Sequence, residues 1–511
     1  MLITDILSFN SAARPDKVAV ICGERQFTFE EIARRTVRLA NALRGLGVGK
    51  GDRVAVLGSN TAEYVEMVFA ISMVGGVWVP LNFRLAPAEL AFIVRDCGAA
   101  TVLFTDDNHA SASATRDLVP EVKNWVSIGA NRTSAGVLDY DDLLRAGSET
   151  SIACPIDPAD LFAVMYTSGT TGRPKGVMLP HDRFLSGTLL SSLGLKITEN
   201  DVKLQVIPQF HAGGQIYQLS HLACGSTIVV CPRFEPELVL RLIESQPVTT
   251  VGLVPSMLIA LLESPAVHRT DFSRLRRVMY GGSSIPEDRL ARALELTQAD
   301  FSQTYGQTEA GVLVSILDEA DHRLGLKKNP EILRSCGRAI LGYDIRLEGG
   351  GDLGEMHVRS SSLMSGYWGR ADATASTLVD GWLLTGDVAR RDDEGRFYIV
   401  DRKKDMIVSG GENIAPAEIE GVLSRHGDVL DVAVIGVPDD RWGEAVKALV
   451  VLRPGRAPQP KELTEFCRGS LGGYKIPKSI EFVDGLPRNA SGKILKAQLR
   501  DPYWQGQERK V

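Results

Sequence analysis

The chain has 511 residues, with 57 Lys+Arg against 63 Asp+Glu, so its formal net charge is −6 at pH 7. Hydrophobic residues make up 44% and charged residues 23%, which is typical of a globular protein and excludes a disordered or fibrous chain. No basic excess favours nucleic acid as a partner. Because one hydrophobic core stops growing near ~250–300 residues, we expect at least two domains.

The cysteines and the N-terminal region indicate in which cellular compartment we expect the protein. The seven cysteines form no CxxC pair and no cluster with His at metal-binding spacing, so we expect reduced thiols. The uncharged stretch between Glu66 and Arg84 is shorter than the ~20 apolar residues of a membrane span. The first residues lack a basic start followed by an apolar run, so no secretion signal is seen. The sequence therefore predicts a cytoplasmic protein without a membrane span.

Helical and strand patterns alternate along the first hundred or so residues. Thr28 and Glu31 form a capping-box pattern, and apolar residues then recur at helical spacing up to Gly45. The next expected elements are a strand at 53–58, helices at 62–74 and 88–96, and a strand at 101–104. Such alternation favours an α/β fold with a largely parallel sheet. The polar residues 107–159 are interpreted as a surface excursion.

The pattern changes after a charged segment at 401–405. The elements expected beyond it are a helix at 417–423, strands at 429–437 and 445–452, and a helix at 461–468. This mixture predicts a compact α+β unit at the C-terminus. We therefore expect two domains, residues 1–401 and residues 402–511.

The most informative segment is Tyr166–Gly176, which follows an apolar strand and combines Ser/Thr hydroxyls, glycines and two cations. Glycines let backbone amides turn toward an anion, while hydroxyls and the charges of Arg173 and Lys175 add further contacts, so the composition suits a triphosphate. The alternative is a solvated turn. A Walker loop is excluded because the final Gly-Lys-Ser/Thr spacing is missing and Pro174 disfavours the helix that should follow.

Tyr166–Gly176 resembles the signature of the adenylate-forming enzymes, which include acyl- and aryl-CoA synthetases, firefly luciferase and the adenylation domains of peptide synthetases. Further segments of the family pattern follow in the expected order: Pro208–His211, Tyr280–Ser283, Tyr305–Glu309, Gly354–Glu355, Gly366–Trp368, Thr385–Asp387, Asp401–Arg402, Gly410–Asn413 and Pro487–Lys493. The resemblance covers nearly the whole chain. It implies a large N-terminal α/β domain of parallel-type sheets with flanking helices, and a small, mobile α+β lid domain with a hinge near Lys404.

The resemblance implies ATP and Mg²⁺ as requirements of the reaction. The residues that it assigns to ATP or AMP binding are Thr167, Ser168, Gly169, Thr170, Thr171, Gly172, Lys175, Gly281, Gly282, Ser283, Tyr305, Gly306, Thr308, Asp387, Arg402 and Lys493. Glu309 would bind Mg²⁺ and Thr308 would contact the α-phosphate. Lys493 would offset the charge that builds up as a carboxylate meets the α-phosphate. The structural alternatives are an ordinary loop acid at Glu309 and a solvated lysine at Lys493.

The remaining site residues concern the acid and the thiol. His211 resembles the histidine that borders and gates the carboxylate site in acyl- and aryl-activating relatives, with a purely structural histidine as the alternative. No Asp that would pair with an amino-acid ammonium is visible near it. The residues that the resemblance assigns to CoA are Gly410, Gly411, Glu412, Arg84, Trp442 and Tyr474. Trp442 could equally be a core anchor.

The function that these features predict is an ATP-dependent carboxylic acid:CoA ligase, an enzyme that works through an acyl-adenylate with release of pyrophosphate and AMP. The expected substrate is a medium- or long-chain fatty acid or an aryl or arylpropenoic acid. The alternatives are a ligase that loads a separate carrier protein, a luciferase-like oxidation, and a non-catalytic adenylate-binding protein. The resemblance is compatible with a homodimer without fixing the oligomeric state.

Overall fold

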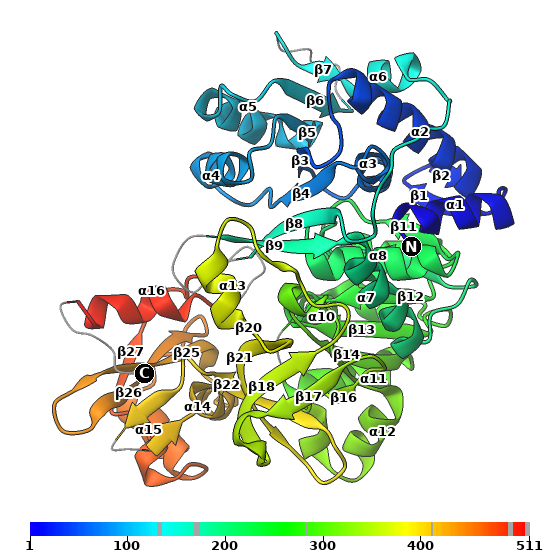
Figure 1. Ribbon diagram of the computed structural model, residues 1–511. Coiled ribbons are helices and arrows are strands. Elements are labelled where there is room, and N and C mark those ends of the chain that lie inside the picture. The colour runs from blue at the N-terminus through cyan, green and yellow to red at the C-terminus, as the bar shows by residue number, and fades with distance from the viewer. Residues whose placement is uncertain (130–134, 168–173, 283–284, 410–411, 489–493, 506–511) are drawn as a thin grey trace. The chain divides into compact units, whose positions relative to one another are not determined.

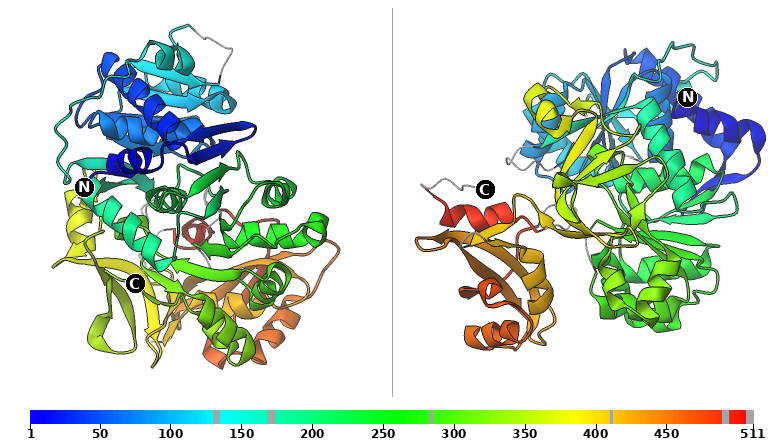
Figure 2. Two further views of the ribbon diagram at one scale, coloured as in Figure 1. Left: turned by 90° about the vertical axis from the view of Figure 1, so that its right-hand side faces the viewer. Right: turned by 60° about the horizontal axis from the view of Figure 1, so that its bottom comes forward.

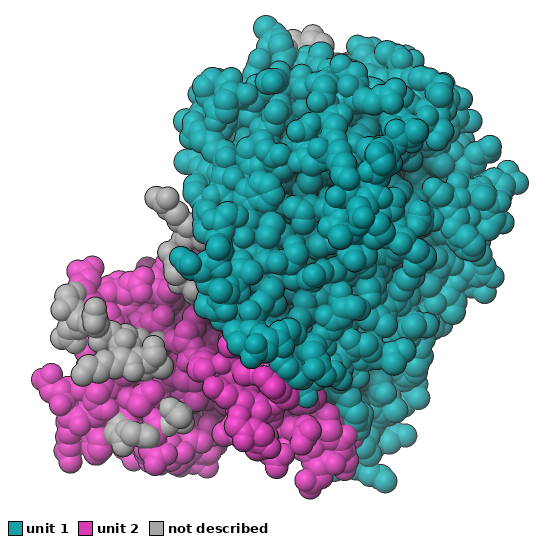
Figure 3. Space-filling view, in the orientation of Figure 1, with its two compact units in different colours: residues 1–345, 358–383 teal, residues 346–357, 384–511 magenta. Residues whose placement is uncertain are grey.

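The computed structural model describes residues 1–129, 135–167, 174–282, 285–409, 412–488 and 494–505. The chain divides into two compact units, which Figure 3 shows in different colours. Unit 1 holds Met1–Ile345 and Val358–Leu383, and unit 2 holds Arg346–His357 and Leu384–Val511. The expected domain boundary between residues 401 and 402 stays a prediction.

The first sheet of unit 1 has eight strands in the order β19-β9-β8-β4-β3-β5-β6-β7 (Figure 1). Their bounds are Gly366–Tyr367 (β19), Lys175–Pro180 (β9), Leu161–Thr167 (β8), Val77–Leu81 (β4), Arg53–Leu57 (β3), Thr101–Thr105 (β5), Asn124–Ile128 (β6) and Leu138–Asp139 (β7). The strands from β8 to β7 pair in parallel, whereas β9 pairs antiparallel with both β8 and β19. The sheet therefore ends in a hairpin on the side of β9.

The second sheet of unit 1 has nine strands in the order β16-β15-β14-β13-β12-β10-β11-β1-β2. Their bounds are Arg338–Ala339 (β16), Ser315–Leu317 (β15), Asp300–Tyr305 (β14), Arg277–Gly281 (β13), Thr250–Leu253 (β12), Val202–Gln205 (β10), Thr227–Val230 (β11), Val18–Cys22 (β1) and Arg25–Thr28 (β2). Its centre is parallel, and only β2, β15 and β16 pair antiparallel. The expected parallel-type architecture thus holds, with antiparallel edges.

Helices cover both sheets of unit 1 in layers (Figures 1 and 2). Buried residues of α4 (Pro87–Cys97) pack on the eight-stranded sheet, and those of α9 (Pro236–Ser245), α10 (Pro255–Glu263) and α11 (Glu287–Thr297) pack on the nine-stranded sheet. Helix α7 (His181–Gly194) contacts α8 (Ala212–Ala223), β8 and β9, while α8 also contacts β10 and β11. The pair α7–α8 therefore lies between the two sheets. The other helices of unit 1 are α1 (Thr4–Ala13), α2 (Phe29–Gly45), α3 (Ala62–Met73), α5 (His109–Leu118), α6 (Tyr140–Ala146), α12 (Glu319–Lys327) and α13 (Ala371–Thr377).

Two local predictions in unit 1 can be compared with the structure. The capping box of α2 is present, because the Glu31 amide donates to Thr28 Oγ1 at 3.1 Å and the Thr28 amide donates to Glu31 Oε2 at 2.8 Å. The interpretation of residues 107–159 as a surface excursion is wrong in part. Strand β6 within that range pairs with β5, and its Trp125 and Val126 are buried. The strand was missed because a short apolar segment between polar residues shows too little hydrophobic periodicity to be recognised as a strand.

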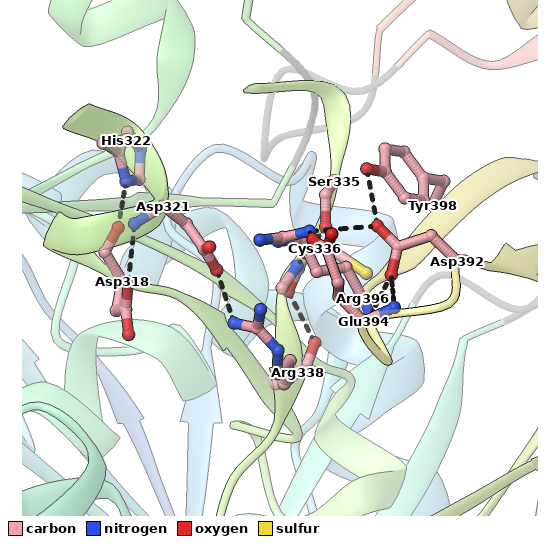
Figure 4. A network of polar contacts seen from close by, with 12 residues as sticks. Asp318, Asp321, His322, Ser335, Cys336, Arg338, Asp392, Glu394, Arg396 and Tyr398 are labelled. Atoms are coloured by element: carbon pink, nitrogen blue, oxygen red, sulfur yellow. Dashed lines mark hydrogen bonds and ion pairs between the residues drawn. The ribbon is translucent and has the colours of Figure 1, made fainter. Parts of the chain in front are cut away.

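The start of α12 is fixed by short polar contacts (Figure 4). The Asp321 amide donates to Asp318 Oδ1 at 2.9 Å, and Arg338 Nη1 donates to Asp321 Oδ2 at 2.7 Å. His322 Nδ1 lies 2.7 Å from the Asp318 carbonyl oxygen, and its Nε2 lies 2.9 Å from the Tyr280 hydroxyl. The side chain of Tyr280 on β13 is therefore engaged on the face of the sheet that carries α12.

Unit 2 contains strands of two further sheets. In the first, which has five strands, Asp387 of β21 (Trp382–Arg391) lies opposite Arg402 of β22 (Phe397–Arg402). The second sheet has the order β24-β23-β26-β25, with β27 pairing with β26. Its bounds are Glu412–Ile414 (β24), Ile407–Ser409 (β23), Gly443–Leu452 (β26), Val429–Asp439 (β25) and Ser479–Phe482 (β27), with helices Pro416–Leu423 (α14), Pro460–Arg468 (α15) and Lys496–Arg500 (α16). The remaining strands of the chain are Asp344–Leu347 (β17), Leu353–Arg359 (β18) and Leu378–Val379 (β20).

The core of unit 2 confirms the predicted α+β pattern. Ile419 of α14 and Leu463 of α15 are fully buried against the apolar residues of β25 and β26.

Among the described residues, no helix combines the length and apolar character needed to cross a membrane.

Candidate active site

The glycine-rich segment connects two antiparallel strands. Thr167 ends β8 and lies opposite Lys175, the first residue of β9, so residues between them form the connection of a β-hairpin. Of the predicted ATP-binding residues, Ser168, Gly169, Thr170, Thr171 and Gly172 lie outside the described residues. A Walker loop leads from a strand into a helix, whereas a strand follows here, which agrees with the exclusion of that motif.

The base of this hairpin is tied to the segment that contains β19. The Tyr166 hydroxyl donates to Asp96 Oδ2 at 2.6 Å, and Arg370 Nη2 lies 2.6 Å from Asp96 Oδ1. The Trp368 amide donates to the Gly176 carbonyl oxygen at 2.7 Å. In the same segment, Lys175 Nζ lies 5.2 Å from the centroid of the Tyr367 ring. These contacts hold both ends of the loop in place.

Glu309 receives contacts from two other segments of unit 1. It lies in a 3₁₀ turn, Thr308–Ala310, shortly after β14 ends. Thr167 Oγ1 and the Tyr367 hydroxyl each donate to Glu309 Oε1 at 3.2 Å. The Met364 amide donates to the Glu309 carbonyl oxygen at 2.9 Å. The structure therefore brings together Thr167, Thr308 and Glu309, which the sequence assigned to phosphate and metal binding.

The turn that carries Glu309 is tight and strained. A Cβ atom on Gly306 would lie 1.6 Å from the Val312 carbonyl oxygen, so only glycine fits this position. Val312 itself has φ 86°, a region that a β-branched residue rarely adopts. Such strain persists only where surrounding contacts impose it, and it is common at functional sites.

The residues expected around adenine also lie close together. Gly281, the last residue of β13, is opposite Thr304, which immediately precedes Tyr305. A Cβ on Gly281 would lie 2.3 Å from the Thr304 carbonyl oxygen, so the close approach of these strand ends requires glycine. Gly282 follows with φ 89°, and Ser283 lies outside the described residues. In an open α/β sheet, ligands bind beyond the carboxyl ends of the strands, which is where Gly281, Gly282 and Tyr305 lie.

His211 is the N-cap residue of α8, and its Nδ1 accepts a hydrogen bond from the Gly213 amide at 3.2 Å. The neighbouring Phe210 packs edge-on against Phe83, with ring centroids 5.2 Å apart. Although part of His211 is accessible to solvent, desolvation by the surrounding chain lowers the pKa of its imidazole, and the Arg84 guanidinium lowers it further. The ring is therefore neutral at pH 7.

Buried amides hold the loop that precedes His211. The Gln209 amide donates to Asn60 Oδ1 at 2.7 Å, and Gln209 Oε1 accepts from the Thr61 amide at 2.8 Å. Gln209 Nε2 donates to Gln218 Oε1 of α8 at 2.7 Å. The position of His211 thus depends on contacts with the start of α3 that no local sequence pattern indicated.

The predicted CoA residues are distributed over both units. Arg84 belongs to unit 1, where its guanidinium acts on His211. Trp442 and Tyr474 belong to unit 2 and are 40% and 47% exposed, so Trp442 is not a core anchor. Glu412 is exposed, whereas Gly410 and Gly411 lie outside the described residues.

The predicted ribose residues of unit 2 form an ion pair. Arg402 Nε lies 2.5 Å from Asp387 Oδ1. The Asp387 amide donates to Thr385 Oγ1 at 3.1 Å, and Thr385 Oγ1 donates to the Met356 carbonyl oxygen at 2.7 Å. Lys493 lies outside the described residues, and Lys404 follows two residues after Arg402.

Unit 2 has a cluster of two carboxylates and a histidine, residue types that bind metals, and a lysine forms ion pairs with its carboxylates. One ligand atom from each of Glu348, Glu355 and His357 lies within 4.8 Å of the others. Lys403 Nζ lies 3.2 Å from Glu348 Oε2 and 2.8 Å from Glu355 Oε2. Glu355 Oε1 also accepts from the Gly386 amide at 3.0 Å. The ammonium offsets part of the negative charge of the two carboxylates, and Glu355 links the cluster to the turn that carries Asp387, so we assign no metal to it.

Sequence reasoning missed two contributors to the site in unit 1. Tyr367 was recognised only as part of a motif, although its hydroxyl contacts Glu309. Tyr217 on α8 contacts Thr304 with an oxygen–oxygen distance of 2.6 Å. Neither contact follows from sequence spacing, because each joins segments that are far apart in the chain.

Known proteins resemble this chain along nearly its whole length. The AMP-binding enzyme family matches residues 8–368, and the AMP-binding enzyme C-terminal domain matches residues 418–493. The feruloyl-CoA synthase of an Amycolatopsis species is 40% identical over 95% of this chain and 96% of its own length. The fatty acid–[acyl-carrier-protein] ligase ScoC of Streptomyces coeruleorubidus is 37% identical over 99% of this chain and 97% of its own length.

Solved structures give the same relationship. The O-succinylbenzoate coenzyme A synthetase MenE of Bacillus subtilis, in complex with ATP and magnesium ion, superposes with a TM-score of 0.83 at 31% identity, covering 97% of this chain and 98% of its own. The expected α/β fold with a smaller C-terminal part is confirmed. The resemblance to the adenylate-forming enzymes is also confirmed, and the chain belongs to the AMP-binding enzyme family as an adenylate-forming ligase.

Proposed function

We propose that the protein is an ATP- and Mg²⁺-dependent carboxylic acid:CoA ligase. In the first step, an acid oxygen bonds to the α-phosphorus of ATP while the bond to the pyrophosphate oxygen breaks. In the second step, a thiol sulfur bonds to the acyl carbon while the bond to the AMP oxygen breaks, and the thiol loses its proton. The acid is a fatty acid of medium or long chain, or an aryl or arylpropenoic acid.

The observation that carries the proposal is the meeting of Thr167, Glu309 and Tyr367 beside the ends of β13 and β14. Joining two anions requires alignment and charge neutralisation more than a protein nucleophile. The hydroxyl of Thr167, the ammonium of Lys175 and the loop between them are chemically suited to hold phosphate groups. Gly281, Gly282 and Tyr305 would hold the adenine, and Asp387 with Arg402 would hold the ribose.

Mg²⁺ fits the donor set at Glu309. A carboxylate with hydroxyl neighbours supplies the hard oxygen ligands that this ion prefers. When bound, the ion supplies positive charge to the phosphates of ATP. In our proposal, Glu309 holds the ion and Thr308 orients the α-phosphate.

His211 would border the acid carboxylate. Its neutral ring carries no charge that would hold the acid too tightly before reaction, and the amide contacts of Gln209 fix the loop before it. Arg84 beside it supplies the positive charge that attracts an anion to this end of α8.

The lid and thiol roles are proposals for the C-terminal part of the chain. Residues 402–511 would form the lid, with the hinge near Lys404 and with Lys493 acting in the first step. Gly410, Gly411 and Glu412 would line the path of the pantetheine arm, and Arg84, Trp442 and Tyr474 would bind the nucleotide end of CoA. The rings of Trp442 and Tyr474 are exposed, and each has a cation near it, with Arg441 Cζ 4.6 Å from the Trp442 centroid and Lys475 Nζ 5.5 Å from the Tyr474 centroid. Such rings and cations suit a base and its phosphates.

A second acceptor has a specific observation in its favour. The relative ScoC, named as an acyl-carrier-protein ligase, matches this chain at 37% identity over 99% of its length. We therefore keep transfer to a separate carrier protein as the alternative second step. A non-catalytic adenylate-binding protein is not supported, because the relatives are ligases.

One assay series tests the proposal. Purified protein is incubated with ATP, Mg²⁺ and graded fatty acids, benzoates or cinnamates, and pyrophosphate exchange, AMP and thioester are measured. Thioester formed with free CoA supports the proposal. AMP formation without CoA thioester, together with loading of a phosphopantetheinyl carrier protein, would favour the alternative. If none of the acids supported pyrophosphate exchange, both the CoA ligase and the carrier-protein ligase would be contradicted.

A further inference from the structure

We propose that Asp96 is a positioning residue of the metal and phosphate site, and that it sets the distance between the two hydroxyl groups that donate to Glu309. It acts through the neighbours of those two hydroxyl residues rather than by contact with ATP. The inference rests on the proposed function, because Glu309 holds Mg²⁺ only in that proposal. Asp96 lies in none of the segments that carry the family resemblance.

Local sequence does not explain an acid at this position. Asp96 lies in the last turn of α4, where the negative end of the helix dipole disfavours a carboxylate. Its side chain is only 13% exposed, so the carboxylate also loses most of its hydration. Contacts outside the helix must therefore compensate for both costs.

Three groups from two other segments contact Asp96. The Tyr166 hydroxyl donates to Asp96 Oδ2 at 2.6 Å, and Arg370 Nη2 donates to Asp96 Oδ1 at 2.6 Å. Trp368 Nε1 donates to the Asp96 carbonyl oxygen at 3.0 Å. An ionised carboxylate only accepts hydrogen bonds, so each of its oxygens has a matching donor here. The end of α4 thus joins β8 to the segment that follows β19.

The same two segments meet a second time at Glu309. Successive side chains of a strand point to opposite faces, so Tyr166 reaches Asp96 whereas Thr167 reaches Glu309. In the other segment Tyr367 reaches Glu309, and the residue after it donates to the Asp96 carbonyl oxygen. Both hydroxyl oxygens lie 3.2 Å from Glu309 Oε1. Asp96 and Glu309 therefore fix the spacing of these segments together, and a change at Asp96 alters the donors of Glu309.

The packing of Tyr166 connects it to both strands that flank the glycine-rich segment. Tyr166 lies opposite Gly176 in the register of β8 and β9, and a Cβ added to Gly176 would lie 3.1 Å from Tyr166 Cζ. The Trp368 amide donates to the Gly176 carbonyl oxygen at 2.7 Å. Burial and the hydrogen bond to Asp96 raise the pKa of Tyr166 above its ordinary value, so the phenol keeps the proton that it donates. Loss of the Asp96 contact would therefore disturb both strands.

Two substitutions remove the same hydrogen bond from its two ends. Asp96→Asn keeps the shape of the side chain, but its NH₂ group is a donor that would face either Tyr166 or Arg370, so one contact is lost. Tyr166→Phe removes the hydroxyl and keeps the ring on Gly176. The double variant shows whether the two substitutions act through one interaction.

Asp201→Asn is the matched control. Asp201 Oδ1 lies 2.5 Å from Arg276 Nη2, and these side chains are 2% and 40% exposed, against 13% and 41% for Asp96 and Arg370. Asp201 immediately precedes β10, so it lies at the amino ends of the parallel strands, opposite the edge where ligands bind. An effect that reflects stability alone will appear in this variant as well.

Binding of ATP is measured by titration calorimetry without any acid, with and without Mg²⁺, and thermal unfolding shows whether each variant folds. We expect Asp96→Asn and Tyr166→Phe each to weaken the binding of ATP with Mg²⁺ by ~5–20-fold, because a charge-assisted hydrogen bond is lost, and to change the binding without Mg²⁺ less. The double variant should bind no more weakly than the weaker single variant.

Acid-dependent pyrophosphate exchange gives the second measurement. KM for ATP should rise by the same factor as the dissociation constant, while KM for the acid stays within about 2-fold of the unaltered enzyme. Asp201→Asn should lower the melting temperature and change none of these constants.

The inference is overturned if the single variants fold and bind ATP with Mg²⁺ as tightly as the unaltered enzyme. If Asp96→Asn does not fold, Tyr166→Phe alone decides. It is equally overturned if the two effects multiply in the double variant, or if KM for the acid rises as much as KM for ATP, because Asp96 would then support the fold rather than the metal site. Absence of exchange with every acid in the unaltered enzyme is a different result: it contradicts the proposed function, while calorimetry still decides the role of Asp96.

Discussion

The carboxylate of Glu309 illustrates how single side chains complete this site. Its Oε1 accepts hydrogen bonds from Thr167 and Tyr367, which belong to two other segments of the chain. The Gly306 and Val312 backbones fix the turn around it. In the role that we propose for Glu309, a carboxylate with two donors and a rigid backbone would hold the magnesium ion in one place.

Glu309→Gln should therefore reduce acid-dependent pyrophosphate exchange by ~10²–10³-fold, because the amide keeps the shape but not the charge. Raising the Mg²⁺ concentration should recover part of the lost rate. Exchange is measured against Glu295→Gln, an exposed change on α11 that should have no effect. A loss smaller than about 3-fold in Glu309→Gln would contradict the assigned role.

At the same scale, the sequence predicted residues carried by motifs and missed residues that act through distant contacts. Gly281, Tyr305 and Glu309 were predicted because the family pattern places them together, and the structure brings them to adjacent strand ends. Tyr217 lies in no recognised motif, and its contact with Thr304 joins α8 to β14. Only the packing of a helix on a sheet reveals such a pair.

Among the elements, β10 has a buried lysine beneath α8. Lys203 is 1% exposed, its ammonium contacts Gln205 Oε1, and burial lowers its pKa to about 7. Burial, together with the charge of Lys203, lowers the pKa of His221 on α8 to about 3. This strand therefore carries a group whose protonation differs between the folded and unfolded chain.

The pH dependence of stability follows from that difference. Between about pH 7 and the ordinary lysine pKa of 10.5, the unfolded chain holds the Lys203 proton and the folded chain does not, so stability rises with pH across this window. The slope approaches ~1.4 kcal/mol per pH unit where only the unfolded state is protonated. Lys203→Met should flatten this rise.

The free energy of unfolding in urea, measured at several values of pH between 7 and 10, tests this prediction. Lys123→Met serves as the control, because Lys123 is exposed and should leave the slope unchanged. An unaltered slope in Lys203→Met would show that the lysine does not cause it.

The elements themselves were predicted well where periodicity was strong. Helix α2 begins with the expected capping box, and α3 spans Ala62–Met73 against an expected 62–74. Strand β6 was missed because a five-residue buried strand carries no period that distinguishes it from a loop with apolar residues. The hairpin β8–β9 was not predicted. The composition of the residues between its strands suits a phosphate loop whether a helix or a strand follows.

For the whole molecule, the central prediction concerns the two half-reactions. Lys493→Ala should abolish most acyl-adenylate formation, a loss of about 10²–10³ in rate, because in the role that we propose its charge acts while the carboxylate meets the α-phosphate. Thioester formation from preformed acyl-adenylate and CoA should remain within a few-fold of the unaltered enzyme.

Both steps are measured separately, by pyrophosphate exchange and by single-turnover transfer from synthetic adenylate. Lys496→Ala is not a suitable control, because Lys496 lies 2.8 Å from the half-buried Glu420 and supports the fold of unit 2. Lys461→Ala, at an exposed position of α15, is the suitable one. Equal loss of the two steps in Lys493→Ala would refute the assignment.

At this scale the sequence predicted a larger α/β part and a smaller α+β part, and the family comparison confirms that order. The limits of the two units were harder to predict from the sequence. Residues Arg346–His357 lie well before the charged segment 401–405 in the chain, yet they belong to unit 2. A division read along the chain cannot show a segment that leaves one compact unit and returns.

The hairpin that carries the glycine-rich segment has a consequence for how nucleotide is retained. A phosphate loop at the start of a helix gains attraction from the helix dipole in addition to its side-chain contacts. Here Lys175 begins a strand, so the loop does not lead into a helix whose dipole would attract phosphate. The binding of ATP at this loop then depends on ammonium, hydroxyl and backbone amide groups, and we expect it to weaken as ionic strength rises.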